Sequence, residues 1–331
     1  MLSAYDYALP ASAIAQTPAE PRDSARLLVA TDPSGGLDHR RVVDLADVLD
    51  DGDLLVVNDT RVLPARLRLR KPTGGAVEVL LLEPLDESGT WEALVKPSRR
   101  LASGTVLTAG EDLAVEVRET LPDGKRAVRL QTADPMAALA EHGAAPLPPY
   151  IHTPLADPER YQTVYARRPG SVAAPTAGLH LTDGVLDRCR ARGIDVVAVD
   201  LAVGLDTFRP IAVEHIEDHE MHSERYRVPP ATLEACHRAN RVVAVGTTTV
   251  RALESAAAGP AEGRTSLFIH GDYRFQVVDV LLTNFHMPRS SLLLLLASFA
   301  GERWRELYDV ALAEGYRFLS FGDAMLVARN R

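Results

Sequence analysis

A run of small residues from 170 to 182 carries four side chains that can form hydrogen bonds: Ser171, Thr176, His180 and Thr182. The glycines and alanines between them, Gly178 included, let backbone N–H groups come close to a ligand. An imidazole titrates near neutral pH, so a histidine here can accept or donate a proton. The alternative is a tight turn around a structural histidine. We favour a binding site, because similar polar segments occur on both sides of this run.

Four other segments share one design, in which an apolar run ends in polar residues: 58–61, 204–210, 246–249 and 283–286. In an α/β sheet the carboxyl ends of parallel strands meet at one edge, so we expect these segments to converge. Gly246 leads directly into a helix whose first N–H groups suit a carboxylate or a phosphate. For 58–61 the alternative is a capped turn, because Asn and Asp favour turns.

Charged residues near these segments add further candidates. Arg251 and Glu254 are three apart on one expected helix and share a face, although a surface ion pair would explain them equally well. The run 215–224 places three histidines, at helical spacing, among carboxylates. It lacks the His-Glu-x-x-His order of a zinc protease, so we expect no metal and instead a polar cleft wall with His222 and Glu224 binding substrate.

Several common enzyme motifs are missing from the sequence. It has no Walker loop, no G-x-G-x-x-G and no G-x-S-x-G segment. This argues against a nucleotide hydrolase, a Rossmann dehydrogenase and a serine hydrolase.

Two patterns of secondary structure position these residues. Apolar strands alternate with amphipathic helices in 1–63 and 151–331, which is typical of an α/β domain. Short strands separated by turns fill 64–150, with one helical stretch at 135–142. We therefore predict an α/β catalytic domain, discontinuous in sequence, that is interrupted by an inserted β-barrel domain.

The inserted segment contains a basic strand. Arg66, Arg68 and Arg70 alternate with leucines, so a period of two puts all three on one face, and Lys71 follows them. The alternatives are a phosphate-binding patch for RNA and an ordinary solvated strand face.

Composition limits the classes of protein to consider. A length of 331 residues fits two domains, and a net charge of −9 excludes non-specific nucleic-acid binding by the whole surface. Two distant cysteines give no disulfide framework and no zinc spacing. There is no signal-peptide pattern, and the longest apolar run, 292–297, is too short to span a bilayer. We expect a cytoplasmic monomer.

Taken in order, these segments resemble one family, the S-adenosylmethionine:tRNA ribosyltransferase-isomerases of the queuosine pathway. The resemblance covers nearly the whole chain. The segments that carry it are 52–66, 147–151, 161–165, 171–180, 219–224, 244–255, 283–286 and 321–325. Each motif is weak by itself, whereas the ordered set is very specific.

The resemblance implies an α/β domain interrupted by a β-barrel, and it also implies a reaction. The ribosyl part of S-adenosylmethionine would move onto the aminomethyl group of a deazaguanine at the wobble position of tRNA and rearrange there. The products would be epoxyqueuosine, adenine and methionine. S-adenosylmethionine would be consumed as a substrate, no cofactor would be needed, and the partner would be tRNA carrying the deazaguanine precursor.

This chemistry needs a base beside the sulfonium, an acid for the departing adenine, and rigid donors around the ribose. The candidate catalytic residues are His180, His286, Asp59, Glu224 and Asp323. The candidate substrate-binding residues are Arg61, Thr176, Gly178, Thr182, His222, Gly246, Thr247, Thr248, Arg251, Glu254 and Asn284. Either Arg251 or the Gly246 turn would hold the methionine carboxylate. The candidate RNA-binding residues are Arg66, Arg68, Arg70 and Lys71.

The chain departs from the family pattern at a few positions. Ala202 stands where a histidine is usual, Asp206 where a glycine is usual, and Leu181 where a phenylalanine is usual. His270-Gly-Asp272 replaces part of a Tyr-Pro-Gly-Tyr-like turn. These changes leave two alternatives open: a diverged transferase that consumes S-adenosylmethionine with another deazapurine or a small molecule, and a non-catalytic RNA-binding relative.

Overall fold

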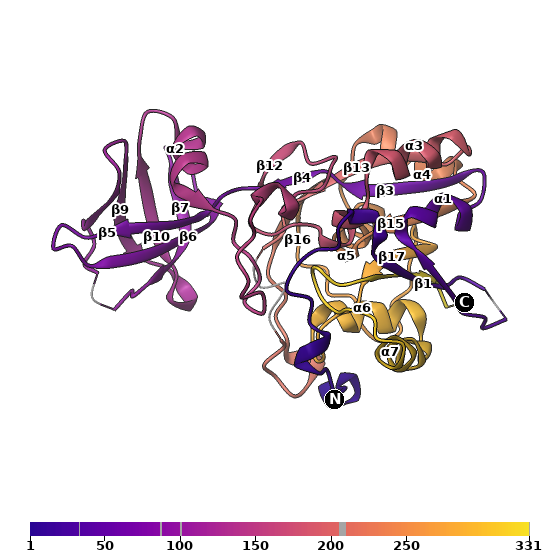
Figure 1. Ribbon diagram of the computed structural model, residues 1–331. Helices are drawn as coiled ribbons and strands as arrows, with labels where there is room; N and C mark the ends of the chain where they lie inside the picture. The colour runs from indigo at the N-terminus through magenta and orange to yellow at the C-terminus, as the bar shows by residue number, and fades with distance from the viewer. Residues whose placement is uncertain (33, 87, 100, 205–209, 331) are drawn as a thin grey trace. The chain divides into compact units, whose positions relative to one another are not determined.

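The computed structural model describes residues 1–331 except 33, 87, 100, 205–209 and 331 (Figure 1). The chain forms two compact units. The first comprises Met1–Thr60, Pro148–Arg168 and Ala174–Arg331, and the second comprises Arg61–Leu147 and Pro169–Ala173. The second unit thus begins at Arg61 and ends its long segment at Leu147, against the limits 64 and 150 that we expect from the sequence.

The first unit is built on a nine-stranded sheet of order β16-β14-β13-β3-β15-β17-β18-β1-β2. The strands are β1 (Arg26–Ala30), β2 (Asp38–Arg41), β3 (Asp53–Asn58), β13 (Asp195–Leu201), β14 (Glu224–Arg227), β15 (Arg241–Val245), β16 (Glu262–Thr265), β17 (Val280–Asn284) and β18 (Ala324–Ala328). β13, β3, β15 and β17 run parallel. β14 and β18 pair antiparallel with the two ends of this group. The sheet is therefore mixed, and its parallel centre brings four strand ends to one edge.

Helices cover both faces of this sheet. In the view of Figure 1, α3 (Asp183–Ala191) lies above the strands, and α6 (Ser291–Ala300) and α7 (Arg303–Ala313) lie below them. The short helix α1 (Leu45–Val48) contacts α3. The buried side chains of α3 are Val185, Leu186 and Cys189, which lie on one side of the helix and join the core that contains Val57. β3 is buried along its whole length, as its continuous apolar run predicts.

The remaining elements of this unit are mostly short, but one of them, the 12-residue helix α5 (Thr247–Ala258), packs against the central strands β13, β15 and β3. They are α4 (Pro230–Arg238), α5 and the 3-10 helices η1 (Leu2–Tyr5), η2 (Ala11–Ala13), η3 (Arg22–Ser24), η4 (Val42–Asp44), η6 (Pro158–Tyr161), η7 (Thr176–His180) and η9 (Ile216–Asp218). Among the described residues, the helices all lack the length and apolar character that crossing a membrane requires.

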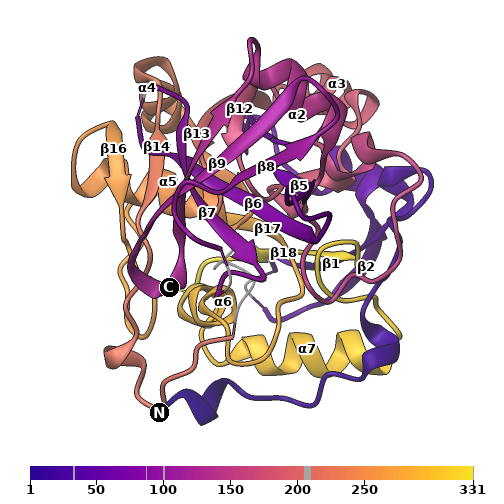
Figure 2. The same ribbon diagram turned by 90° about the vertical axis from the view of Figure 1, so that its left-hand side faces the viewer.

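The second unit is a β-barrel, as predicted; its strands can be followed in Figure 2. They are β5 (Arg66–Arg70), β6 (Ala76–Pro84), β7 (Thr90–Lys96), β8 (Val106–Ala109), β9 (Leu113–Thr120) and β10 (Arg126–Gln131). They pair in the order β5-β6-β7-β10-β9-β8, and Arg70 pairing with Thr108 closes the barrel. Closure leaves no long free strand edge. The fold class, an α/β domain with an inserted β-barrel, is confirmed.

A few short elements complete this unit. β11 (Gly143–Ala144) pairs with β5, and η5 (Pro122–Gly124) lies in the turn between β9 and β10. α2 (Pro135–His142) is the helix expected there, and it begins where Asp134 caps two backbone N–H groups. β4 (Thr60–Val62) pairs with β12 (Arg168–Ser171).

Candidate functional site

The end of β3 is tied to its neighbours by one amide side chain. Asn58 is fully buried, and its Nδ2 donates to the carbonyl of Leu201 at 3.0 Å while its Oδ1 accepts from the N–H of Leu201 at 3.1 Å. The same Nδ2 lies 3.4 Å from Oγ1 of Thr248. Asn58 therefore fixes the ends of β3 and β13 beside the first turn of α5.

The turn from β15 into α5 requires a glycine. Gly246 has φ +86°, a backbone conformation that other residues adopt only with strain. α5 starts immediately after it with Thr247 and Thr248, and the first N–H groups of a helix have no acceptor within the helix. The turn thus presents hydrogen-bond donors and the positive end of the helix dipole at the sheet edge.

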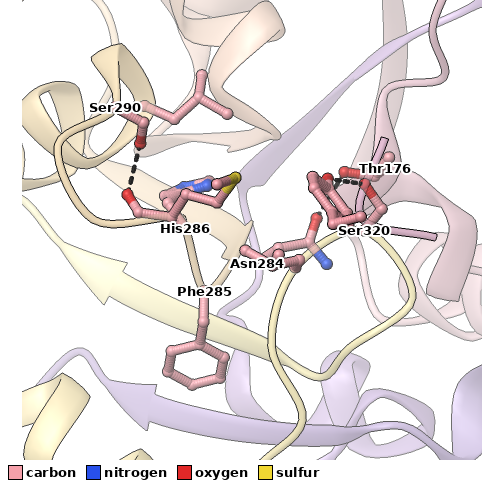
Figure 3. A pocket seen from close by; sticks show the side chains of 10 residues that line it. Thr176, Asn284, Phe285, His286, Ser290 and Ser320 are labelled. Atoms are coloured by element: carbon pink, nitrogen blue, oxygen red, sulfur yellow. Dashed lines mark hydrogen bonds between the residues drawn. The ribbon is translucent and has the colours of Figure 1, made fainter. Parts of the chain in front are cut away.

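The end of β17 meets the small-residue segment around η7. Oγ1 of Thr176 donates to Oδ1 of Asn284 at 2.9 Å. Figure 3 shows Thr176, Asn284 and Ser320 on one side of a pocket and His286 and Ser290 on the other. Residues far apart in the sequence therefore face one hollow.

His286 is buried in this pocket and held from several sides. Its Nε2 shares a 3.0 Å hydrogen bond with Oγ1 of Thr283, and its backbone N–H donates to the hydroxyl of Tyr308 at 2.7 Å. The hydroxyl of Tyr7 donates to its carbonyl. Burial lowers the pKa of His286 to about 3, so the imidazole is neutral at physiological pH.

Two adjoining hollows make up the pocket. The residues that line both are Thr176, Asn284, His286 and Leu292, and the second hollow adds Gly246, Thr247, Thr248, Thr283 and Val203. Each has a volume of about 20 Å³, which is room for about one water molecule. A nucleoside therefore enters only when the lining side chains move apart.

His180 is not among the residues that line these hollows. It is buried, and its two ring nitrogens face backbone carbonyls, Nε2 that of Gly322 at 2.8 Å and Nδ1 that of Ala177 at 3.2 Å. Burial lowers the pKa of His180. A neutral imidazole can donate to only one of these carbonyls, and the shorter contact, with Gly322, holds η7 against the loop before β18.

Glu224 and Arg251 form a buried ion pair beside the pocket. Oε2 of Glu224 accepts from Arg251, and its Oε1 accepts from the N–H of Gly204 at 2.9 Å and lies 3.1 Å from Nε2 of His222. Burial alone would raise the pKa of Glu224, but Arg251 and His222 outweigh it and the net pKa is lowered. The guanidinium of Arg251 is thus already engaged.

Four other predicted residues have structural roles: three bind backbone N–H groups, and the fourth allows a close approach of a neighbouring side chain. Glu254 accepts the N–H groups of Gln276, Val277 and Val278 at 2.8, 3.0 and 3.1 Å. Asp323 accepts the N–H groups of Arg26 and Arg317 at 3.0 and 2.8 Å. Thr182 caps α3, and a Cβ at Gly178 would lie 1.9 Å from the hydroxyl of Tyr165. None of the four is among the residues that line the two hollows.

Asp59 lies at a different cavity, together with Arg168, Asp200 and Arg227. Burial raises the pKa of Asp59, with the guanidinium of Arg168 opposing it.

Arg61 belongs to the second unit. On β5 of that unit, Arg68 and Arg70 are exposed and Arg66 is half-buried, whereas the leucines between them are buried, so the three arginines share one face. Lys71 follows them and is half-buried.

The run 215–224 is not helical: η9 covers only Ile216–Asp218, and β14 begins at Glu224. Among the described residues, the group that could hold a metal ion is Asp112, Glu141 and His142 on the barrel, and none of the three histidines of the run belongs to it.

Ala202 is half-buried, and its N–H donates to the carbonyl of Arg225 at 2.9 Å. Asp206 lies outside the described residues.

The sequence analysis missed the residues that hold the pocket together. Thr283 lies within a quoted segment, so its position near the end of a buried strand was a usable signal. Tyr7 and Tyr308 contact the backbone of His286 from the two ends of the chain, and no local pattern marks them. Asp200 and Arg227, which pair across β13 and β14, were also missed.

The fold and the pocket define a class: an α/β domain that carries an inserted β-barrel and gathers polar strand ends around one buried histidine. The family model for queuosine biosynthesis proteins matches residues 2–327. The chain therefore belongs to the queuosine biosynthesis protein family.

Similar proteins agree with this membership. The chain is 53% identical over 325 residues to the S-adenosylmethionine:tRNA ribosyltransferase-isomerase of Rubrobacter xylanophilus, covering 97% of this chain and 96% of the relative. It is 52% identical over 345 residues to the protein of that name from Thermus thermophilus, covering 98% and 99%. The crystal structure of the S-adenosylmethionine tRNA ribosyltransferase from Thermotoga maritima matches with a TM-score of 0.55 and 37% identity, covering 98% of this chain and 99% of that chain.

Proposed function

We propose that this chain is a transferase that moves the ribosyl moiety of S-adenosylmethionine onto the aminomethyl-deazaguanine wobble base of tRNA and isomerises it. The products are epoxyqueuosine, adenine and methionine. Relatives more than 50% identical over nearly their full length carry this activity in their names. That likeness favours this reaction over a diverged activity or a non-catalytic role.

One observation carries the assignment to a site. Thr176, Thr247, Thr248, Asn284 and His286 come from three separate segments, and all five line one pocket at the edge of the parallel strands. Brought together, they offer hydroxyls, an amide, an imidazole and the N-terminal end of a helix. Such donors suit a ribose, a base edge and an anionic group. This pocket is where we propose that S-adenosylmethionine binds.

We assign a role to each of these groups from its surroundings. The neutral imidazole of His286, fixed by Thr283, acts as a hydrogen-bonding group toward the adenosyl part and not as a titrating base. Thr176 and Asn284 orient the ribose as a pair. After Gly246, the N–H groups of Thr247 and Thr248 in the first turn of α5 are offered to an anionic group of either substrate, whereas Arg251 stays with Glu224.

The tRNA contacts are a second part of the proposal. Arg66, Arg68 and Arg70 occupy every second position of β5, so their guanidinium groups lie in a row on one face. Such a row suits successive phosphates of an RNA backbone. The enzyme acts as a monomer in the cytoplasm and needs no cofactor beyond the S-adenosylmethionine that it consumes. Size-exclusion chromatography with light scattering tests the monomer.

Release of adenine tests the reaction. The chain is incubated with S-adenosylmethionine labelled in its adenine, with or without tRNA that carries the deazaguanine precursor. The proposal predicts adenine release only with that tRNA. Release without RNA would support the diverged transferase, and RNA binding without any release would support the non-catalytic relative. Unmodified tRNA is the matched control.

A further inference from the structure

A second cavity in the first unit is much larger than the hollows beside His286. It has a volume of about 250 Å³, against about 20 Å³ for each of those hollows. It lies along β13, and its charged lining residues are Asp59, Arg168, Asp200 and Arg227. This size is near the lower end for small-molecule sites, so an amino acid would fit better than a nucleotide.

The lining carries two charges of each sign. Asp200 on β13 is directly opposite Arg227 on β14 in the antiparallel register. On the other side, Nε of Arg168 is 3.6 Å from Oδ2 of Asp59, which is too long for a hydrogen bond. Nε of Arg227 is 3.4 Å from Oε2 of Glu262, whose side chain is exposed. Among the residues that the structure describes, the four charges therefore line one cavity without a hydrogen-bonded ion pair between them.

One carboxylate oxygen of the lining accepts no hydrogen bond from the residues that the structure describes. Asp59 is 8% exposed, and its Oδ1 is buried without a hydrogen-bond partner among the described residues. A buried carboxylate whose hydrogen bonds are incomplete costs free energy, and a cationic ligand group beside Asp59 would recover part of that cost. Burial raises the pKa of both Asp59 and Asp200, and the nearby carboxylate of Asp200 also raises that of Asp59. A cationic donor placed between them relieves both effects.

The rest of the lining is apolar. Val197, Ala198, Val199 and Pro229 line the cavity between its charged ends. Thr232 also lines it, but its hydroxyl donates to the carbonyl of Ala198 at 2.8 Å and so ties α4 to β13. An apolar side chain of a ligand can pack on this wall while its charged groups reach the carboxylates and guanidiniums.

We propose that this cavity is a binding site for a zwitterionic α-amino acid with an apolar side chain. The α-ammonium lies between Asp59 and Asp200, and the carboxylate lies against Arg168 and Arg227. The candidate ligand rests on the proposed function, since methionine is a product of that reaction. The source is either free methionine or the methionyl end of S-adenosylmethionine, which share this chemistry.

Calorimetry with L-methionine tests the site without needing turnover. The wild-type chain binds methionine, and D200N and R227Q each weaken that binding at least tenfold. D195N is the matched control, because Asp195 is an exposed residue of the same strand outside the cavity lining, and it binds as the wild type does. Unchanged binding in D200N and R227Q, or no methionine binding at all, would overturn the proposal.

Two analogues test recognition of both charges. 3-(Methylthio)propylamine lacks the carboxylate and 4-(methylthio)butanoate lacks the ammonium, so each binds at least tenfold more weakly than methionine. An amine that binds as tightly as methionine would overturn a zwitterion site. D200N also identifies the source: weaker binding of S-adenosylmethionine places its methionyl end here, and unchanged binding indicates a separate amino-acid site. Methionine binding in a chain that releases no adenine would refute the proposed function alone.

Discussion

Oγ1 of Thr176 donates a 2.9 Å hydrogen bond to Oδ1 of Asn284, although 108 residues separate them. Thr176 begins a 3-10 turn of small residues, and Asn284 ends a buried strand. This bond joins the loop segment to the sheet edge and so closes one wall of the pocket. The predictions below test this arrangement and the charges around it.

Replacing Asn284 with alanine removes the acceptor of Thr176 and one pocket donor. We expect kcat/KM for adenine release to fall by about 10- to 100-fold, because losing such a hydrogen bond costs about 1–3 kcal/mol. Steady-state kinetics measures the loss. S298A is the control, since the hydroxyl of Ser298 donates to the carbonyl of Gly271 in an exposed contact. Full activity in N284A would exclude this wall from the site.

His180→Asn separates a structural histidine from a catalytic one. Because both ring nitrogens of His180 face carbonyls, we expect a loss of about 1–3 kcal/mol in the free energy of unfolding. Turnover should stay within about twofold at a temperature where the variant is folded. Denaturant titration and adenine release measure the two quantities. A large loss of turnover with unchanged stability would return His180 to the catalytic set.

Buried His286 makes stability depend on pH. Its pKa is lowered to about 3 in the folded chain, so between pH 6.5 and pH 3 the unfolded chain binds a proton that the folded chain does not. The free energy of unfolding therefore falls as pH drops through this window, and H286N should weaken the fall. Urea titrations at several pH values measure it. The same pH dependence in H286N would contradict the assigned environment.

Glu224→Gln leaves the buried guanidinium of Arg251 without its counter-charge. We expect a loss of about 3–5 kcal/mol in the free energy of unfolding, because an uncompensated buried charge is costly. E306Q, which removes a 3.9 Å ion pair with Arg303 at an exposed site, should cost less than about 1 kcal/mol. Thermal or urea unfolding compares the two. Equal effects would show that the buried pair is not what holds this corner.

The double variant R68Q/R70Q tests the basic face of β5. Removing two phosphate contacts should lower the slope of log Kd for tRNA against log salt by about 1.5. Binding of S-adenosylmethionine should not change. R129Q is the control, because Arg129 is an exposed arginine on β10 of the same barrel. If R129Q changes the slope as much as the double variant does, β5 is not a specific RNA-binding face.

Local patterns predicted much of the fold. The apolar run of β15 followed by Gly246 predicted a strand that turns directly into a helix, because glycine alone takes that backbone conformation easily. Alternating strands between turns predicted the barrel, since its residues pair mostly with near neighbours in sequence. The antiparallel direction of β18 was not foreseen, because strand direction depends on the path of the preceding chain.

The site was less predictable for a physical reason. A side chain's role depends on which distant group it meets, and residue type alone does not specify that partner. His180 and His286 both follow small polar segments, yet one is held between carbonyls and the other faces a pocket. In the same way Arg251 meets Glu224, 27 residues away, and that pairing engages a group expected to bind substrate.

The most direct test is a crystal structure of the chain with a non-reactive analogue of S-adenosylmethionine in which an amine replaces the sulfonium. The account predicts electron density for the adenosyl group against Thr176, Asn284 and His286, with these side chains moved apart to admit it. Density for the adenosyl group elsewhere, with this pocket still closed, would contradict the account.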